Sequence, residues 1–154
     1  LFLPRVFITT DFVTFTEKIA DREYIMKYIK NYVLFFAIIS AIILVGSYLF
    51  ASEILSIFGK EYMMYSDSFF ILIIGIIGIF LLRGVFGNLL ASIGRIEVNY
   101  YIISIALLIN VISNQYLIPI YGIKGAAITS AILMWFTGIL SWLCFMYLYR
   151  KKYR

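Results

Sequence analysis

Hydrophobic residues form four long runs along this chain, and charged residues are confined to the segments between the runs. The uncharged runs cover residues 31–52, 68–82, 98–123 and 125–149. A helix rises about 1.5 Å per residue and the hydrocarbon core of a bilayer is about 30 Å thick, so three of the runs are long enough to cross it. The run at 68–82 becomes long enough if Arg83 is included. The pattern predicts four transmembrane segments.

The composition of the runs indicates helices rather than strands. Hydrophobic residues make up 64% of the chain and its mean hydropathy is +1.00. A helix on the surface of a soluble domain would be apolar on one side only, whereas these runs are apolar all round. Strands of a membrane barrel would alternate apolar and polar residues. We therefore expect an all-α, polytopic membrane helical bundle with four full transmembrane helices.

Basic residues gather on one side of the membrane if the helices alternate in direction. That side carries Lys18, Arg22, Lys27, Lys30, Arg95, Arg150, Lys151, Lys152 and Arg154. The other side carries Lys60 and Lys124 together with Glu53, Glu61 and Asp67. The distribution follows the positive-inside rule and predicts that both chain ends are cytoplasmic. It also explains the net charge of +5 by topology and contact with anionic membrane lipids, so we expect no nucleic-acid partner.

The titratable residues argue against an enzyme. The chain has no histidine, and Cys144 is its one cysteine. A disulfide framework is therefore excluded and a zinc site is disfavoured. No pairing of a nucleophile with a general base stands out. We expect no catalytic residues, no metal site and no cofactor.

The segments outside the runs define three parts of the chain. Residues 1–30 are expected to hold the end of a transmembrane helix, at 1–8, followed by an amphipathic cytoplasmic connector. Residues 31–149 form the four-helix bundle, and residues 150–154 form a basic cytoplasmic tail. Because the chain opens on an apolar fragment too short to span, we expect it to be a piece of a longer protein.

Two outer turns are marked by glycine and proline. Phe58 followed by Gly59 predicts a helix end with a left-handed cap. Pro119 and Gly122 predict a tight turn that ends the third helix and lets the fourth begin at Ala126.

Arg83 is the strongest candidate for a functional residue inside the spans. It is the only charged residue there, about 12 Å deep from the cytoplasmic end near Ala91. A guanidinium at that depth is costly, so it should face a polar cavity, pair with another group or snorkel to the interface. In a cavity it would hold phosphates or an acidic sugar.

Polar and small residues recur on single helix faces. Asn110, Ser113 and Asn114 share one face of the third helix, where they either bind sugar hydroxyls or join helices by hydrogen bonds, and the second role is favoured. Asn88 shares a side of the second helix with Gly84 and Gly87, which indicates close helix packing. The same packing role is expected for Ala126, Ser130, Thr137 and Ser141, whereas Gly75 and Gly78 are expected to add bending.

Several short motifs appear in an ordered series. They are LPR at 3–5, DRE at 21–23, IFGKEY at 57–62, LASIGR at 90–95, the stretch from Asn110 to Asn114, and LIPIYGIKGAA at 117–127. In this order the chain resembles the C-terminal part of the polysaccharide flippases, which translocate O-antigen and capsule repeat units, in the multidrug/oligosaccharidyl-lipid/polysaccharide exporter superfamily. The resemblance covers nearly the whole chain and roughly the last third of a family member.

The resemblance implies a twelve-helix transporter of two lobes, of which this chain supplies a C-terminal lobe fragment. It further implies flipping of a lipid-diphosphate-linked oligosaccharide across the bacterial inner membrane by alternating access, for surface polysaccharide biosynthesis. The expected partners are that substrate, membrane lipids and the missing N-terminal lobe. The expected substrate-binding residues are Arg83, Asn88, Asn110 and Asn114.

Two other functions stay open from the sequence. A cation-coupled multidrug antiporter of the same superfamily would usually need a buried carboxylate, and the uncharged runs contain none. A non-transporting accessory subunit of glycan assembly is compatible with four helices and short loops.

Overall fold

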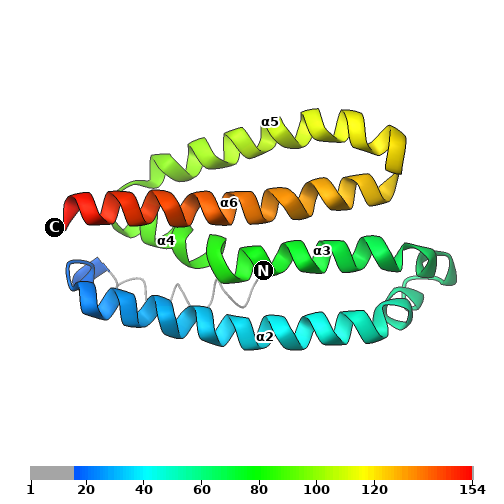
Figure 1. Cartoon of the computed structure of the whole chain (residues 1–154), viewed down its shortest axis with the longest axis horizontal. Helices are drawn as coiled ribbons and strands as arrows, with labels where there is room; N and C mark the ends of the chain where they lie inside the picture. The colour runs from blue at the N-terminus through cyan, green and yellow to red at the C-terminus, as the bar shows by residue number, and fades with distance from the viewer. Residues whose placement is uncertain (1–15, 154) are drawn as a thin grey trace.

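A computed structural model of the chain describes residues 16–153, and its long elements are all helices, with no strand in that range (Figure 1). The elements in order are α2 (Arg22–Ser56), the 3₁₀ helix η1 (Lys60–Tyr65), α3 (Ser66–Gly78), the π-helical turn η2 (Ile79–Arg83), α4 (Gly84–Ser92), α5 (Ile96–Tyr121) and α6 (Ile123–Lys152). Because α3, η2 and α4 follow one another without a break, they form one long helix.

Four helical segments are long and apolar enough to cross a membrane, at Arg22–Ser56, Lys60–Ser92, Ile96–Tyr121 and Ile123–Lys152. They coincide with the four runs predicted from the sequence. The all-α, polytopic bundle is therefore confirmed for the described part of the chain. The partial helix expected at 1–8 lies outside the described residues.

The first helix begins earlier than the uncharged run. Asp21 caps α2, because its carboxylate accepts a 3.0 Å hydrogen bond from the backbone N–H of Tyr24. Residues 22–30, predicted as part of the amphipathic connector, are therefore the first turns of α2. Near its other end α2 is kinked at Phe50, whose φ and ψ of −122° and 21° are not helical.

The two turns predicted from glycine and proline differ in detail from the prediction. The first helix ends at Ser56, and Gly59 has a φ of 142° and a ψ of 146°, so it is not in the left-handed helical region. The third helix continues through Pro119 to Tyr121, and the fourth starts at Ile123 rather than at Ala126. The whole reversal is made at Gly122, whose φ of 57° favours glycine.

The fourth helix is the centre of the bundle. α6 packs against α5, α3, η2 and α4, whereas α2 packs against α3, η1 and η2. In Figure 1, α5 and α2 accordingly lie on opposite sides of the pair formed by α6 and the α3–α4 helix. Ile102 is the one buried residue of α5, so most of that helix surface is uncovered.

Glycines allow α3 and α6 to approach closely. A Cβ at Gly75 would lie 2.7 Å from the Cα of Ala131, and one at Gly78 would lie 2.9 Å from the Trp135 ring. From the other side, a Cβ at Gly138 would lie 2.9 Å from the Cβ of Leu82. Gly75 and Gly78, expected to add bending, therefore have a packing role, and the local irregularity is the π turn that follows them.

The two ends of the bundle differ in charge. Figure 1 shows the start of α2, the turn between α4 and α5 and the C-terminal end together at one end, where most of the basic residues occur. At the opposite end, η1 lies near the turn into α6 and an exposed ion pair joins Lys124 to Asp67 at 3.0 Å. The helices therefore alternate in direction (Figure 1), as the distribution of basic residues predicted.

Candidate functional site

Arg83 occupies an unusual backbone position. It is the last residue of the π turn η2, and its side chain is half-buried. A π turn inserts one extra residue into a helix, and such turns often occur at functional sites. The extra residue changes the direction of the helix face that carries Arg83 relative to α3.

Two helices supply hydrogen-bond acceptors to Arg83. Its Nη1 donates to Oδ1 of Asn99, on α5, at 2.6 Å and to the Oγ of Ser141, on α6, at 2.8 Å. Hydrogen bonds that involve an ionised group are stronger than those between neutral groups. The guanidinium therefore ties the α3–α4 helix to both of its neighbours on this side of the bundle.

Both acceptors are held in place by hydrogen bonds of their own. The Nδ2 of Asn99 donates to the carbonyl oxygen of Gly87 at 2.7 Å. The hydroxyl of Ser141 donates to the carbonyl oxygen of Thr137 at 2.7 Å, which leaves its lone pairs free to accept from Arg83. Ser141 is completely buried. The network is therefore fixed in its donor and acceptor directions.

Gly87 makes room for this network. A Cβ at that position would lie 2.7 Å from Nη1 of Arg83 and 3.6 Å from Oδ1 of Asn99. A side chain at residue 87 would thus press on the guanidinium. The small-residue stripe on the second span, predicted as a packing face, is in contact with the polar network at this point.

The positive charge of Arg83 has no acidic partner among residues 16–153. The ion pairs in that range are Arg95 with Glu97 and Lys124 with Asp67, and each of these side chains is about half exposed or more. Asn99 and Ser141 are neutral, so they stabilise the guanidinium without cancelling its charge. Both hydrogen bonds also come from the same nitrogen, Nη1.

A groove of about 410 Å³ opens beside Arg83 between η2, α5 and α6. Its lining residues are Ile79, Arg83, Ile103, Ala106, Leu107, Asn110, Ser130, Leu133, Met134 and Thr137. The wall is mostly apolar, with one guanidinium, one amide and two hydroxyl groups. Such a groove can hold an elongated ligand that has an anionic group beside Arg83 and hydrogen-bonding groups near Asn110.

The four predicted site residues fall into two groups. Arg83 and Asn110 line the same groove, although they belong to different helices. Asn88 is exposed and its Nδ2 donates to the carbonyl oxygen of Gly84 within its own helix, at 2.6 Å. Asn114 donates to Oδ1 of Asn110 at 3.1 Å and is not part of the groove wall. It therefore lies about one turn further along α5 than Asn110, and its hydrogen bond orients the Asn110 amide.

Asn99 was not singled out by sequence reasoning, and Ser141 was assigned only a packing role. A signal for Asn99 exists, because it lies as far after Ala91 as Arg83 lies before it. Two antiparallel helices joined near Ala91 would place both residues at the same depth. The sequence contains no comparable signal for Ser141, since its contact with Arg83 depends on how α6 packs against the second span.

Other residues that could bind a metal ion or react chemically are few in the described part of the chain. Among the residues that the structure describes, no group of three or more His, Cys, Asp or Glu side chains is placed to hold a metal ion. Cys144 is a free, partly buried thiol on α6. Trp135 donates from Nε1 to the carbonyl oxygen of Ile74 at 3.0 Å, and so joins α6 to α3.

Comparison of the chain with family models, with curated proteins and with solved structures finds no match.

Proposed function

We propose that the chain is part of a membrane transporter that moves a lipid-diphosphate-linked oligosaccharide across the bacterial inner membrane by alternating access. Its C-terminus is cytoplasmic in this proposal, and a further lobe of the same protein closes the transport path. The observation that carries the proposal is the half-buried charge of Arg83, which neutral groups hold at the wall of a groove.

A cation in this position favours an anionic ligand. Removing a guanidinium from water is costly, and the residues that hold Arg83 within the described range carry no negative charge to compensate it. A phosphate or an acidic sugar would supply that charge. A guanidinium presents several donors in one plane, which suits phosphate oxygens.

The rest of the groove suits a carbohydrate joined to a lipid. Asn110, Ser130 and Thr137 place an amide and two hydroxyl groups near Arg83, and these can hydrogen-bond sugar hydroxyls. The remaining wall is apolar and includes Leu107 and Leu133. Mixed lining of this kind is compatible with a substrate that carries both polar and apolar parts.

The positions of the acidic residues favour this function over a cation-coupled antiporter. Glu53 and Asp67 lie near the ends of α2 and α3, and Glu97 lies in the first turn of α5. None of them lines the groove beside Arg83. A proton- or sodium-carrying site would place a carboxylate at such a groove.

Export complementation tests the proposal. The complete protein is expressed in a strain that lacks a glycan flippase, and surface glycan is measured together with the undecaprenyl-linked repeat unit that accumulates inside. We expect the wild-type protein to restore surface glycan and Arg83→Ala to abolish that restoration at equal expression. Asn88→Ala is the matched control, because its side chain bonds only within its own helix and should leave export unchanged.

Two outcomes would contradict the proposal. Full export by Arg83→Ala would remove Arg83 from the substrate path. Inner-leaflet accumulation with well-expressed wild-type protein and a matched substrate would instead favour an antiporter, tested by proton-coupled dye efflux from vesicles, or an accessory subunit.

A further inference from the structure

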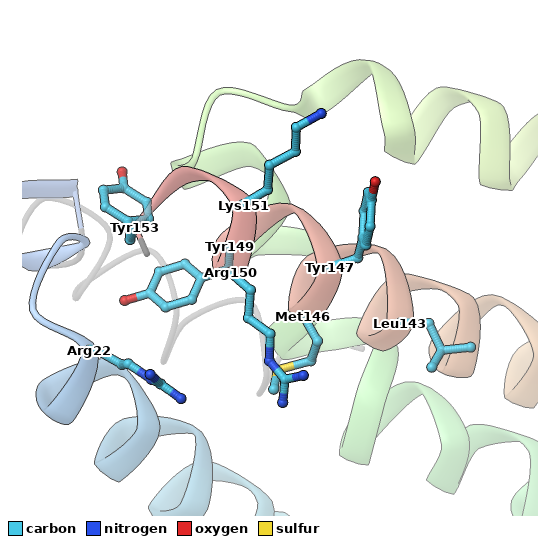
Figure 2. A pocket seen from close by; sticks show the side chains of 8 residues that line it. All are labelled: Arg22, Leu143, Met146, Tyr147, Tyr149, Arg150, Lys151 and Tyr153. Atoms are coloured by element: carbon cyan, nitrogen blue, oxygen red, sulfur yellow. The ribbon is translucent and has the colours of Figure 1, made fainter.

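A second hollow lies at the basic end of the bundle, between the start of α2 and the end of α6. Its volume is about 830 Å³. Its lining residues are Arg22, Leu143, Met146, Tyr147, Tyr149, Arg150, Lys151 and Tyr153. Two of these, Arg22 and Arg150, are cations with side chains between the two helices (Figure 2), whereas one cation lines the Arg83 groove. The proposed transport function does not use this site.

Two arginines from different helices converge on this hollow. Figure 2 shows Arg22 of α2 and Arg150 of α6 extending into the space between the two helices. In the same view Lys151 and Tyr147 extend to the other side of α6. Within residues 16–153, neither Arg22 nor Arg150 forms an ion pair with a carboxylate. The neighbouring carboxylate of Asp21 accepts a hydrogen bond from the backbone of Tyr24 as the cap of α2.

The floor of the hollow is rigid. Tyr149 is buried, its hydroxyl donates to the carbonyl oxygen of Ile19 at 2.9 Å, and its ring stacks on Phe145 with centroids 5.1 Å apart. Lys152, about one turn further along α6, donates to the carbonyl oxygen of Ile93 at 2.9 Å. The last turns of α6 are thus held by hydrogen bonds to two other segments of the chain.

The wall changes from charged to apolar along one face of α6. Leu143, Met146 and Arg150 follow a spacing of three and four residues, so they lie above one another on the same face. Arg150 is at the end of the membrane-spanning helix, whereas Leu143 is about two turns further into it. A molecule bound here would place its charged part at the interface and its apolar part along the helix.

We propose that this hollow binds the phosphate-bearing headgroup of an anionic membrane phospholipid. Arg22 and Arg150 contact the phosphate oxygens from two helices, and Tyr149 forms the floor beneath them. One acyl chain lies along Met146 and Leu143. Basic pockets between membrane helices on the cytoplasmic side are a recurrent way of binding anionic headgroups. The bound lipid joins the first and last spans of this chain, which otherwise share few contacts.

Native mass spectrometry of the purified full chain in detergent tests this site. The protein is titrated with phosphatidylglycerol or with phosphatidylcholine of the same acyl chains, and the fraction that retains one lipid is measured. We expect phosphatidylglycerol to bind at least about fivefold more tightly. Arg22→Gln and Arg150→Gln should each weaken phosphatidylglycerol binding about fivefold, as expected for the loss of one interfacial cation.

Arg95→Gln is the matched control, because Arg95 lies at the same end of the bundle but pairs with Glu97 at 3.2 Å, away from the hollow. We expect this variant to change affinity by less than about twofold. Arg22→Gln, on the other helix, tests the same site if Arg150→Gln does not fold.

Three results would overturn the proposal. The first is equal retention of phosphatidylglycerol and phosphatidylcholine. The second is a loss of phosphatidylglycerol affinity in Arg95→Gln as large as that in Arg150→Gln. The third is displacement of phosphatidylglycerol by millimolar inorganic phosphate. The last result would assign the site to a free anion. This measurement involves no glycan, so its failure is distinct from a failure of the export test.

Discussion

Arg83 and Asn99 are joined by a 2.6 Å hydrogen bond although they are 16 residues apart, on the two sides of the turn between α4 and α5. The same asparagine donates back to Gly87, on the helix that carries Arg83. One amide therefore both accepts from the cation and closes the helix pair. Asn99 therefore links the position of the Arg83 guanidinium to the packing of α5 against the helix that carries it.

Asn99→Ala is expected to destabilise the bundle by about 1–2 kcal/mol. The substitution removes the oxygen that accepts from Arg83 and the N–H that donates to the carbonyl oxygen of Gly87. Each hydrogen bond between membrane helices contributes about 0.6 kcal/mol on average and up to about 1.7 kcal/mol. Equilibrium unfolding in mixed detergent measures the change. Asn88→Ala should change the free energy of unfolding by less than about 0.5 kcal/mol, because Asn88 is exposed. Equal losses in the two variants would show that Asn99 has no special structural role.

Gly75→Ala is expected to destabilise the protein by about 1–3 kcal/mol, because the new methyl group would meet the backbone of Ala131. Gly46 provides the control, since a Cβ there has no neighbour within 4 Å. Gly46→Ala should stabilise α2 by about 0.5–1 kcal/mol through helix propensity alone. Thermal unfolding of the two variants side by side measures both changes. A neutral Gly75→Ala would mean that α3 and α6 are further apart in solution.

Asn110→Leu is expected to reduce export more than Asn114→Leu does. Asn110 is part of the groove wall with Arg83, whereas Asn114 contacts the groove only through its 3.1 Å hydrogen bond to Asn110. The export assay with matched expression levels measures the difference. The prediction rests on the proposed function, and equal export by Asn110→Leu and wild type would remove the amide from the transport path.

The membrane orientation is testable by cysteine labelling in a Cys144→Ser background. Arg95→Cys and Lys151→Cys, at the basic end, should react with an impermeant thiol reagent only after the cells are opened. Met64→Cys, which replaces an exposed side chain in η1 at the opposite end, should react in intact cells. Labelling of residues 64 and 95 from the same side would contradict the alternating topology.

The helices could be predicted from the sequence because each one depends on the length and apolar composition of its own segment. Only helices and closed barrels satisfy all backbone groups within a bilayer, and continuous apolar runs without alternating polar residues are typical of helices. The exact turns were harder to predict. Pro119 lies inside the last turn of α5, although proline is disfavoured within a helix, and the chain reverses only at Gly122. The absence of a side chain at Gly125 lets the start of α6 approach the carbonyl group of Leu117, and this contact depends on how the two helices pack.

The candidate site could be predicted only in part. Arg83 stood out because a single cation among apolar residues needs a reason, and Asn110 shared a polar face of α5. The sequence could not separate Asn110 from Asn114, which are one turn apart, since the orientation of α5 toward α6 decides which of them reaches the groove. The π turn at Ile79–Arg83 was also hidden, because no residue type demands it.

The sequence by itself determined that this is an all-α membrane protein with four spans, and it singled out one cation within them, because apolar length and the cost of a buried charge are properties of each segment alone. Only the tertiary structure decided that α6 is the central helix, that Ser141 and Asn99 hold Arg83, and that Arg22 and Arg150 meet at the other hollow. Those relationships join residues far apart along the chain, and they depend on which helix faces come into contact.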